Sequence, residues 1–593
     1  MPRSIESHAL IGDTHTAALV DDEGRIDWLC LPRFDSGACF AALLGAPENG
    51  YWQIAPAGGG SAVRRGYRDD TLVLETEFAA DGGRVRVIDC MPVRDGQADL
   101  VRRVEGLSGN VRMRCTFVPR FDYGRIPPWF NGDGRRVHAF AGPDSLTLSS
   151  GADLGVADGA VKGDFTVGAG EVVAFHLAWT PTDRKAVPID DIGDAVETTT
   201  RWWRRWIGEH DREGPYRKAV TRSLITLKAL TYAPGGGVVA APTTSLPEVI
   251  GGSRNWDYRY CWVRDAAFAL LAFLDAGYAE EAFAWREWLL RAVAGRPEQM
   301  QIMYGVAGER RVPEMELPWL AGYARSSPVR LGNAAAEQLQ LDVYGELMNA
   351  FHHIRINGIG PQAHAWEVQR ALLDFLESNW REPDQGIWEM RGHPRQFTFS
   401  KVMAWVAADR TVKDAERFGL AGPVDRWRRL RQEIFDDVCR LGYDDRRATF
   451  TQSYGRPALD AALLRMPLVG FLPARDERIA GTVAAIESEL RQKGLVRRYK
   501  PRDEADGLPG EEAAFLPCTF WLADVRLLQG RTGEAVKIFE HLLGLRNDVG
   551  LLAEEYDPGN RRFTGNFPQA LSHIALIHTA LQLTSALGAR RAA

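Results

Sequence analysis

The feature of this chain that most constrains its fold is a change of hydrophobic period near residue 185. Before that point, short runs alternate apolar and polar residues, most clearly at 111–117, and Gly-Asp turns such as 81–83 separate them. After about Ile189, apolar residues recur at helical spacing, for example at Val220 and Leu224. A two-residue period indicates strands, and a period of about 3.6 indicates helices. The sequence therefore predicts an N-terminal antiparallel β-sandwich followed by a helical domain.

The length of 593 residues also favours two large domains, because single hydrophobic cores stop growing at about 250–300 residues. We predict a sandwich domain at 1–187, a linker helix at 188–213 and a helical domain at 214–593. Twelve helices with long loops between alternate pairs fit a double ring whose loops crowd one end, and such loops are usually functional. The expected helices are one after Pro215 and those at 265–275, 279–294, 333–354, 362–379, 400–417, 424–440, 459–467, 476–492, 513–529, 532–545 and 568–587.

The composition excludes several classes of function. The net charge is −6 and the basic residues are dispersed, which argues against a nucleic-acid partner. No run of about 18 apolar residues is present, so we expect no membrane-spanning helix. The seven cysteines are odd in number and form no C-x-x-C motif, and the N-terminus has no apolar leader. We therefore expect a cytoplasmic protein without a disulfide framework.

The loop at 251–265 is dense in charged and aromatic residues. Arg264 and Asp265 follow Trp262, and Tyr258 lies four residues before Trp262. Charged groups among aromatic ones are costly to bury without partners, and a guanidinium beside a carboxylate can grip sugar hydroxyls. Asp265 would also suit the N-cap of the following helix, which is the structural alternative. We interpret this loop as part of a polar pocket.

Two later loops each carry a candidate acid. Glu389 follows Trp388, and an aromatic neighbour raises a carboxyl pKa by desolvation, as a general acid requires. The alternative is a surface ion pair between Glu389 and Arg391. Glu554 follows the apolar run 551–553, so a pocket floor could hold it, although a solvated acidic loop is the commoner arrangement.

A fourth segment combines Arg498 and Tyr499 with Glu511 and Glu512 ahead of a helical run. These residues could position a substrate, or the two acids could favour a helix N-terminus electrostatically. The twelve histidines show no metal-ligand spacing, and no H-E-x-x-H occurs. We therefore expect neither a metal nor a cofactor.

Together and in this order, the motifs resemble glycoside hydrolase family 15, which comprises glucoamylases, glucodextranases and bacterial or archaeal trehalases. The resemblance covers nearly the whole chain and is not confined to one loop. Single motifs of this kind are weak, but five in the right order in the helical half are hard to explain by chance. The matching segments are 11–13, 24–36, 260–265, 332–345, 388–389, 400–403 and 553–556.

The resemblance implies an (α/α)6 barrel behind the sandwich and hydrolysis with inversion, with Glu389 as general acid and Glu554 as general base. Inversion needs carboxyl groups about 6.5–9.5 Å apart, a gap that two separate loops can provide. Glu511 and Glu512 are not assigned as the acid because they fall in the family's next helix-start segment. The substrate-binding residues that we predict are Tyr258, Trp262, Arg264, Asp265, Trp388, Arg391, Arg498, Tyr499, Glu511 and Tyr556.

The expected partner is a small sugar, and the expected activity is exo-hydrolysis of α,α-trehalose. This preference follows from the likeness to the sandwich-bearing bacterial trehalases and from trehalose being an internal solute. The alternative substrates are those of a glucoamylase or an isomalto-oligosaccharide glucohydrolase. A non-catalytic carbohydrate-binding protein is an alternative of another class, and it would lack one of the two carboxylates. The sequence predicts no oligomeric state.

Overall fold

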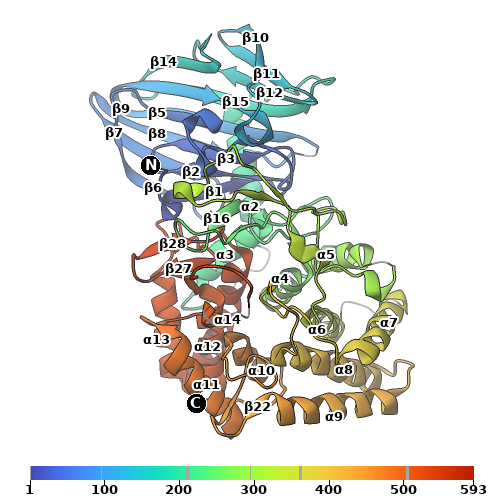
Figure 1. Cartoon of the computed structure of the whole chain (residues 1–593). Coiled ribbons are helices and arrows are strands. Elements are labelled where there is room, and N and C mark those ends of the chain that lie inside the picture. The colour runs from blue at the N-terminus through green and yellow to red at the C-terminus, as the bar shows by residue number, and fades with distance from the viewer. Residues whose placement is uncertain are drawn as a thin grey trace.

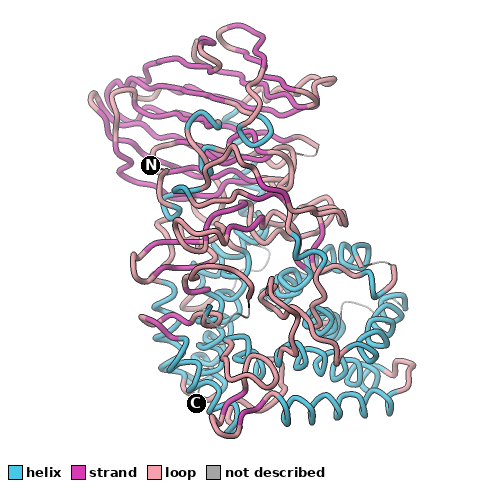
Figure 2. The backbone as a smooth tube through the Cα atoms, in the orientation of Figure 1, coloured by secondary structure: helices cyan, strands magenta, loops and turns pink. Residues whose placement is uncertain are grey.

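A β-sheet domain sits on a helical domain in the computed structural model (Figure 1), which describes residues 2–94, 96–208, 213–293, 295–358, 363–501 and 506–592. The N-terminus lies in the sheet domain, and the C-terminus lies at the far side of the helical one. The long strands lie in the sheet domain, whereas the strands of the helical domain are short and lie in its loops (Figure 2). This division confirms the change of period near residue 185.

The sheet domain is built around one long strand, β9 (Ala98–Val118). Its first half pairs with β8 and β15, and its second half pairs with β5 and β14, so β9 belongs to both layers of the sandwich. All these pairings are antiparallel. The other strands are β1 His8–Gly12, β2 Ala17–Asp21, β3 Arg25–Cys30, β4 Ala38–Phe40, β5 Tyr51–Pro56, β6 Ser61–Tyr67, β7 Leu74–Ala80, β8 Gly83–Cys90, β10 Trp129–Asp133, β11 Arg136–Ala141, β12 Asp144–Ser150, β13 Gly155–Ala157, β14 Ala160–Gly168 and β15 Val172–Pro181.

The alternation predicted from the sequence in β9 is the alternation of burial. Val111, Met113 and Cys115 are buried, whereas Arg112 and Arg114 are exposed. Between the two halves of β9 lies Gly106, where an added Cβ would lie 1.9 Å from the carbonyl oxygen of Gly168. Only glycine allows that approach, so it lets the strand pass from one layer to the other.

The helix α2 (Ile192–Gly208) joins the two domains and packs on β9, β15 and α3. Its apolar side buries Val196, Trp203 and Trp206. The indole N–H of Trp206 bonds to Glu281 in the helical domain. Part of the predicted linker, at 209–212, lies outside the described residues.

The helical domain is a closed double ring. Its inner helices are α4, α6, α8, α10, α12 and α14; a 3-10 turn at Ala461–Leu464 connects α8 with α10, and α14 returns to α4. The outer helices α3, α5, α7, α9, α11 and α13 alternate with them along the chain. The bounds are α3 Arg217–Ala229, α4 Val263–Ala276, α5 Ala279–Ala292, α6 Asp342–Ile356, α7 Ala363–Asn379, α8 Thr398–Phe418, α9 Val424–Leu441, α10 Arg465–Leu468, α11 Glu477–Leu490, α12 Leu516–Leu528, α13 Thr532–Leu543 and α14 Ala570–Ala592.

Two predicted helices differ from the observed ones. The segment predicted at 333–354 begins as a 3-10 turn, Ala334–Glu337, and α6 starts only at Asp342. The segment predicted at 459–467 is the 3-10 turn Ala461–Leu464, followed by the short α10. Positions 294 and 362, at the ends of two other predicted helices, lie outside the described residues.

Among the described residues, one helical stretch, residues 570–588 of α14, is long and apolar enough to cross a membrane, contrary to the expectation from the sequence. Of this stretch, 61% is buried inside the protein. Because α14 packs against α3, α4 and α12, its apolar side chains are explained by the core of the barrel.

Short strands brace the long loops at one end of the barrel. They include β16 and β17 in the first loop and β26, β27 and β28 around the last. Their bounds are β16 Thr244–Pro247, β17 Asn255–Asp257, β18 Cys261–Trp262, β19 Met303–Tyr304, β20 Met315–Glu316, β21 Arg330–Leu331, β22 Tyr443–Asp444, β23 Thr449–Phe450, β24 Arg491–Gln492, β25 Leu495–Val496, β26 Ala514–Phe515, β27 Glu555–Asp557 and β28 Arg562–Thr564.

The sandwich contacts these loops directly. Arg259 is fully buried, forms a two-point ion pair with Asp257, and donates to the carbonyl oxygen of Ser36 at 2.9 Å. Trp28 of β3 donates its indole N–H to the carbonyl oxygen of Pro242 at 2.8 Å. Through these contacts, Ser36 and Trp28 of the sheet domain help to fix the position of the barrel loops.

Candidate active site

A cavity opens where the long loops meet the ends of the inner helices. Its walls come from five loops and from the first two turns of α4 and α12 and the start of α14. Nine of the residues predicted as catalytic or substrate-binding line it, so the structure brings together side chains that lie more than 200 positions apart. They are Tyr258, Trp262, Arg264, Asp265, Trp388, Glu389, Arg391, Arg498 and Tyr499.

Glu389 is held by hydrogen-bond donors from the first loop. Its Oε1 accepts the indole N–H of Trp262 at 2.5 Å and lies 3.4 Å from Nη2 of Arg264. Its backbone is in the left-handed region with φ of 60°, a conformation that non-glycine residues adopt mainly at constrained sites. The amide of Gln338 donates to the carbonyl oxygen of Glu389 and fixes this backbone from the other side.

Burial raises the pKa of the Glu389 carboxyl above its ordinary value, and the nearby Arg264 opposes the rise. The side chain remains partly accessible from the cavity, with 17% of it exposed. A raised pKa favours the protonated form of the carboxyl group, which is the form that a general acid needs. The aromatic neighbour predicted for this acid was Trp388, but the indole that contacts the carboxylate is Trp262. Trp388 instead donates to Asp460 at 2.8 Å.

Arg264 and Asp265 form the predicted pair. Nε of Arg264 donates to Asp265 at 2.9 Å, and Nη1 donates to the carbonyl oxygen of Ile387 at 2.7 Å. Asp265 is not an N-cap, because α4 already begins at Val263 and the cap position is Trp262. Both side chains are almost buried yet line the cavity. This arrangement presents a carboxylate and a guanidinium side by side to a bound hydroxyl-rich molecule.

Glu554 lies beside the cavity and is hydrogen-bonded to Tyr258, which lines it. The phenol O–H of Tyr258 donates to Oε1 of Glu554 at 2.7 Å, and the backbone N–H of Asn566 donates to Oε2 at 3.0 Å. Gly565 leaves room for this carboxylate, because a Cβ there would lie 2.5 Å from Oε2. Burial raises the pKa of Glu554 to about 7, with a further rise from the charge of Glu248, while Arg498 and Tyr258 act in the opposite direction.

One loop therefore holds both candidate catalytic carboxylates. Trp262 binds Glu389 and Tyr258 binds Glu554, and the two aromatic rings touch edge to face with centroids 5.3 Å apart. The carboxylates come from two other loops; Glu389 lines the cavity, and Glu554 lies beside it, bound to Tyr258 of the cavity wall. Two carboxylates held by separate hydrogen bonds around one cavity suit an acid and a base that act on one bond.

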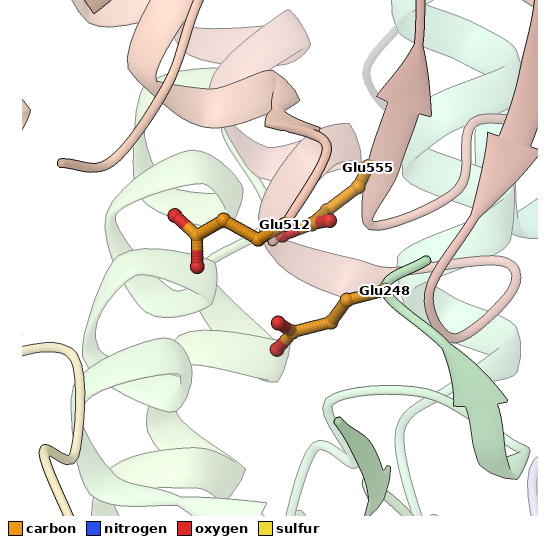
Figure 3. A group of neighbouring side chains, drawn as sticks. All are labelled: Glu248, Glu512 and Glu555. Carbon is orange, nitrogen blue, oxygen red and sulfur yellow. The ribbon is translucent and has the colours of Figure 1, made fainter. Parts of the chain in front are cut away.

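Three buried glutamates, Glu248, Glu512 and Glu555, lie close together (Figure 3). Arg498 lies among them, and we call these four residues the glutamate nest. Carboxylate oxygens of the three lie within 4.8 Å of one another, a spacing that a metal ion could use. Nη2 of Arg498 already lies 3.0, 2.7 and 3.3 Å from them. The Arg498 guanidinium thus supplies the positive charge that these three carboxylates share.

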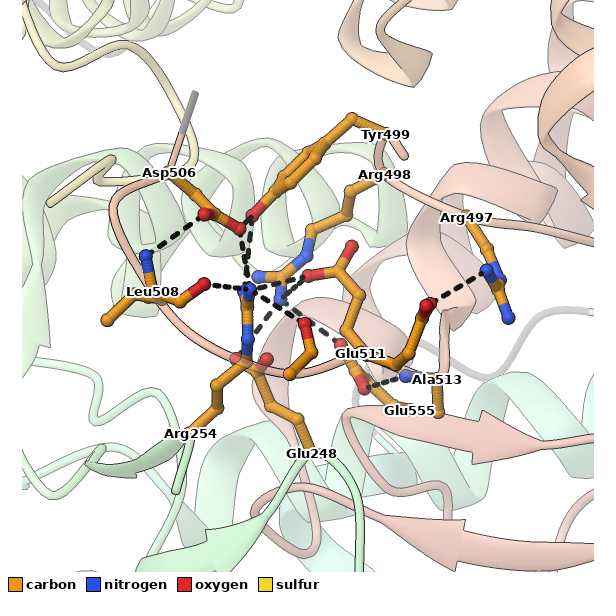
Figure 4. A network of polar contacts seen from close by, with 12 residues as sticks. Glu248, Arg254, Arg497, Arg498, Tyr499, Asp506, Leu508, Glu511, Ala513 and Glu555 are labelled. Carbon is orange, nitrogen blue, oxygen red and sulfur yellow. Dashed lines mark hydrogen bonds and ion pairs between the residues drawn. The ribbon is translucent and has the colours of Figure 1, made fainter. Parts of the chain in front are cut away.

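A second guanidinium, that of Arg254, completes the network (Figure 4). It donates to Asp506 at 2.6 Å and lies 3.6 Å from Glu512. Burial raises the pKa of Glu512 and of Glu555, the charge of Glu248 adds to the rise for both, and Arg498 opposes it. The nest therefore binds protons more readily than separate carboxylates in water would.

The rim of the cavity is formed by cations stacked on an indole. Arg330 and Arg391 lie 4.6 and 4.8 Å from the ring centroid of Trp256. Arg391 does not pair with Glu389. It donates to Glu314 and to Asn333, both at 2.9 Å. The rim is thereby tied to the loop that precedes α6.

Two predicted substrate-binding residues do not line the cavity. Glu511 has a side chain that is 49% exposed and forms an ion pair with Arg497 at 3.4 Å. Its neighbour Glu512 is buried and lies 2.7 Å from Nη2 of Arg498. Tyr556 lies in β27 and packs edge to face on Phe563, beside a separate surface hollow. Their placement corrects the expectation for both.

The sequence analysis missed several residues of the cavity. Arg254 and Trp256 lay within the loop already marked as polar and aromatic, so their type was a usable signal. Glu248 stands outside that cluster, after β16, and Asn333 precedes a 3-10 turn. No motif in the sequence marks Glu248, and Asn333 falls within the matching segment 332–345 without being singled out there.

Comparison with known proteins agrees with this geometry. The family model described as glycosyl hydrolases family 15 matches residues 214–581, and that of the trehalase-like N-terminal domain matches 1–166. Trehalase of Mycobacterium tuberculosis is 37% identical over 98% of this chain and 90% of its own length. Trehalase of Thermoplasma volcanium is 36% identical over 98% of this chain and 94% of its own length.

A solved structure, that of a bacterial glucoamylase complexed with acarbose, shares the fold over the whole chain. Its TM-score is 0.73 at 12% identity, and the match covers 100% of this chain and 97% of that one. The predicted combination of a β-sandwich and a helical barrel is therefore confirmed. By the match of the family model over most of the helical barrel and by its full-length relatives, this chain belongs to glycosyl hydrolases family 15.

Proposed function

We propose that this protein is an inverting, exo-acting hydrolase of α,α-trehalose. The observation that carries the proposal is the pair of seats formed by Trp262 and Tyr258, which hold Glu389 and Glu554 at one cavity. The trehalases of Mycobacterium tuberculosis and Thermoplasma volcanium, similar along nearly the full chain, support trehalose as the substrate.

Each carboxyl group has one task in the proposed reaction. The Glu389 carboxyl donates its proton to the oxygen that bridges the two glucose units, and the bond from C1 to that oxygen breaks. Glu554 takes a proton from a water molecule as that water attacks C1 from the opposite face. One glucose leaves with its original α configuration, and the other is released as β-glucose.

The division of tasks follows the resemblance to the family, and burial raises the pKa of both carboxyl groups. Glu389 lies beside the Arg264–Asp265 pair, and its raised pKa favours the protonated form that a general acid needs. Glu554 accepts two hydrogen bonds that stabilise its charged form, as a base requires. The Arg264–Asp265 pair lies beside Glu389 and is suited to bind hydroxyls of the glucose whose bond is cleaved.

The test is glucose release from trehalose, maltose and isomaltose under the same conditions. We expect trehalose to be cleaved with the highest kcat/KM. Proton NMR in the first minutes, before mutarotation, should show α- and β-glucose in equal amounts. Cleavage of maltose without cleavage of trehalose would reject the proposed substrate, and formation of α-glucose alone would reject inversion.

A further inference from the structure

We propose that Glu248 binds the substrate directly, by accepting a sugar hydroxyl at the point where Arg498 meets the cavity. The inference rests on the proposed function, since it names another residue of the same sugar-binding site. Glu248 follows β16 directly, and it is one of the three glutamates around Arg498. Among these three, it alone lines the cavity in the described part of the chain.

The orientation of this carboxylate is fixed through one of its oxygens. Oε1 accepts the indole N–H of Trp256 at 3.1 Å and lies 3.0 Å from Nη2 of Arg498. The backbone N–H of Glu248 donates to the carbonyl oxygen of Arg254 at 3.1 Å. Because the Glu248 side chain is bound to both Trp256 and Arg498, it cannot rotate freely, and its second oxygen has a defined position.

That second oxygen, Oε2, is buried and has no hydrogen-bond partner among the described residues. The whole residue is 2% exposed. Leaving a buried carboxylate oxygen without a donor is costly, and native structures nearly always supply one. A sugar hydroxyl entering the cavity is such a donor. An acceptor on Glu248 beside a donor on Arg498 also matches the two roles that neighbouring hydroxyls of a glucose ring can play.

The position of Glu248 gives the proposal an independent readout. Its negative charge is the largest charge effect that raises the pKa of Glu554. A base must be ionised, so activity falls as the pH drops through the pKa of Glu554. Removing the charge of Glu248 lowers that pKa and shifts the acidic limb of the pH profile to lower pH.

The experiment compares three variants with the wild type: Glu248→Gln, Glu248→Asp and Glu512→Gln. The Glu248→Gln side chain keeps an oxygen for Trp256 but offers an amide where the hydroxyl acceptor was, so KM for trehalose should rise about 10- to 100-fold, as expected for a lost hydrogen bond to a charged group. The acidic limb should move to lower pH. Glu248→Asp withdraws the oxygen and keeps the charge, so KM should rise while the acidic limb stays in place.

Glu512→Gln is the matched control, because Glu512 is equally buried and lies 2.7 Å from Arg498 but does not line the cavity. If Glu248 acts only by holding Arg498, the two Gln variants raise KM by the same factor, and the proposal is overturned. It is also overturned if KM of Glu248→Gln stays within about twofold of the wild type, less than one hydrogen bond is worth. Thermal melting of each variant separates loss of folding from loss of binding.

Calorimetric titration with glucose provides a measurement that needs no turnover. Glucose should bind Glu248→Gln at least about tenfold more weakly than the wild type, and equal affinities would contradict the proposal. If the wild type cleaves maltose but not trehalose, the proposed substrate fails, while the Glu248 comparison stands or falls with maltose. The two failures are therefore distinguishable.

Discussion

The surroundings of the two candidate catalytic carboxylates differ in their balance of charge. Around Glu389, one guanidinium, that of Arg264, meets two carboxylates, at 2.9 Å for Asp265 and 3.4 Å for Glu389. Around Glu554, the Arg498 guanidinium serves three other buried carboxylates, and Glu554 itself lies beside them. We call these the acid side and the base side of the cavity.

Both raised pKa values have burial as their first cause, but they differ in their largest charge effect. On the acid side, that effect comes from the Arg264 cation, which limits the rise in the pKa of Glu389, and Asp265 adds a smaller rise. On the base side, it comes from the charge of Glu248, which increases the rise in the pKa of Glu554. Removing a neighbour on the acid side should therefore change hydrogen bonding most, whereas on the base side it should change the position of the pH profile.

The greatest loss of activity should follow replacement of Glu389 or Glu554 themselves. Glu389→Gln and Glu554→Gln should each lower kcat for trehalose at least about 100-fold, because each loses a proton-transfer group. α-Glucosyl fluoride distinguishes them, since fluoride leaves without a proton donor. We expect Glu389→Gln, but not Glu554→Gln, to hydrolyse the fluoride at a substantial rate. Equal loss on both substrates by both variants would contradict the assignment of acid and base.

The next effect concerns the free energy of unfolding. Arg498→Met removes the cation shared by three buried carboxylates, and breaking a buried ion pair in this way costs about 3–5 kcal/mol. Arg264→Met leaves Asp265 and a Glu389 that still has the Trp262 donor, so its loss should be smaller. Thermal melting at neutral pH compares the two. A melting temperature lowered more by Arg264→Met than by Arg498→Met would refute the contrast between the two sides.

A smaller effect is a shift of the pH profile by Tyr258→Phe. The phenol donates to Glu554 at 2.7 Å and stabilises its charged form, so its loss raises the pKa of Glu554 further. Because the base must be ionised, the acidic limb of kcat/KM should move to higher pH by ~0.5–1 unit. This direction is opposite to that expected for Glu248→Gln. An unmoved limb would mean that another group limits activity at low pH.

The smallest effect is expected outside the cavity. Glu511→Gln removes an exposed ion pair with Arg497, and such pairs contribute about 0–1 kcal/mol. Its kcat and KM should stay within about twofold of the wild type. A loss comparable with that of Glu512→Gln would restore Glu511 to the site and show that the loop rearranges around substrate.

The sequence predicted the architecture and most of the site because both leave local signals. The alternation at 111–117 reflects one buried face of β9, and the Arg264–Asp265 pair stands in a loop too polar and too aromatic for packing. The helix predicted from residue 333 began too early because apolar and alanine-rich residues continue the helical period through a turn that is 3-10. The hydrophobic period of the sequence therefore does not show where this loop ends and α6 begins.

The errors at the site come from three-dimensional placement. Glu511 and Glu512 are chemically identical neighbours, and only the fold decides that Glu512 points into the nest. Tyr556 follows Glu554 by two positions, but Glu554 precedes β27, so strand alternation does not place the two together. Glu248 lies among apolar residues and prolines, and its partners Trp256 and Arg498 are supplied by a strand pair and a distant loop.

The contact between Arg259 and Ser36 has a consequence for how the protein can be divided. Arg259 is adjacent to Tyr258, and its buried charge depends on a carbonyl oxygen that belongs to the N-terminal half. If the helical barrel were produced alone, this guanidinium would lose that acceptor and the shelter of the sandwich, directly beside the residue that holds Glu554. The boundary between the two domains in the sequence is therefore not a boundary of the catalytic unit, and the smallest active fragment should contain both.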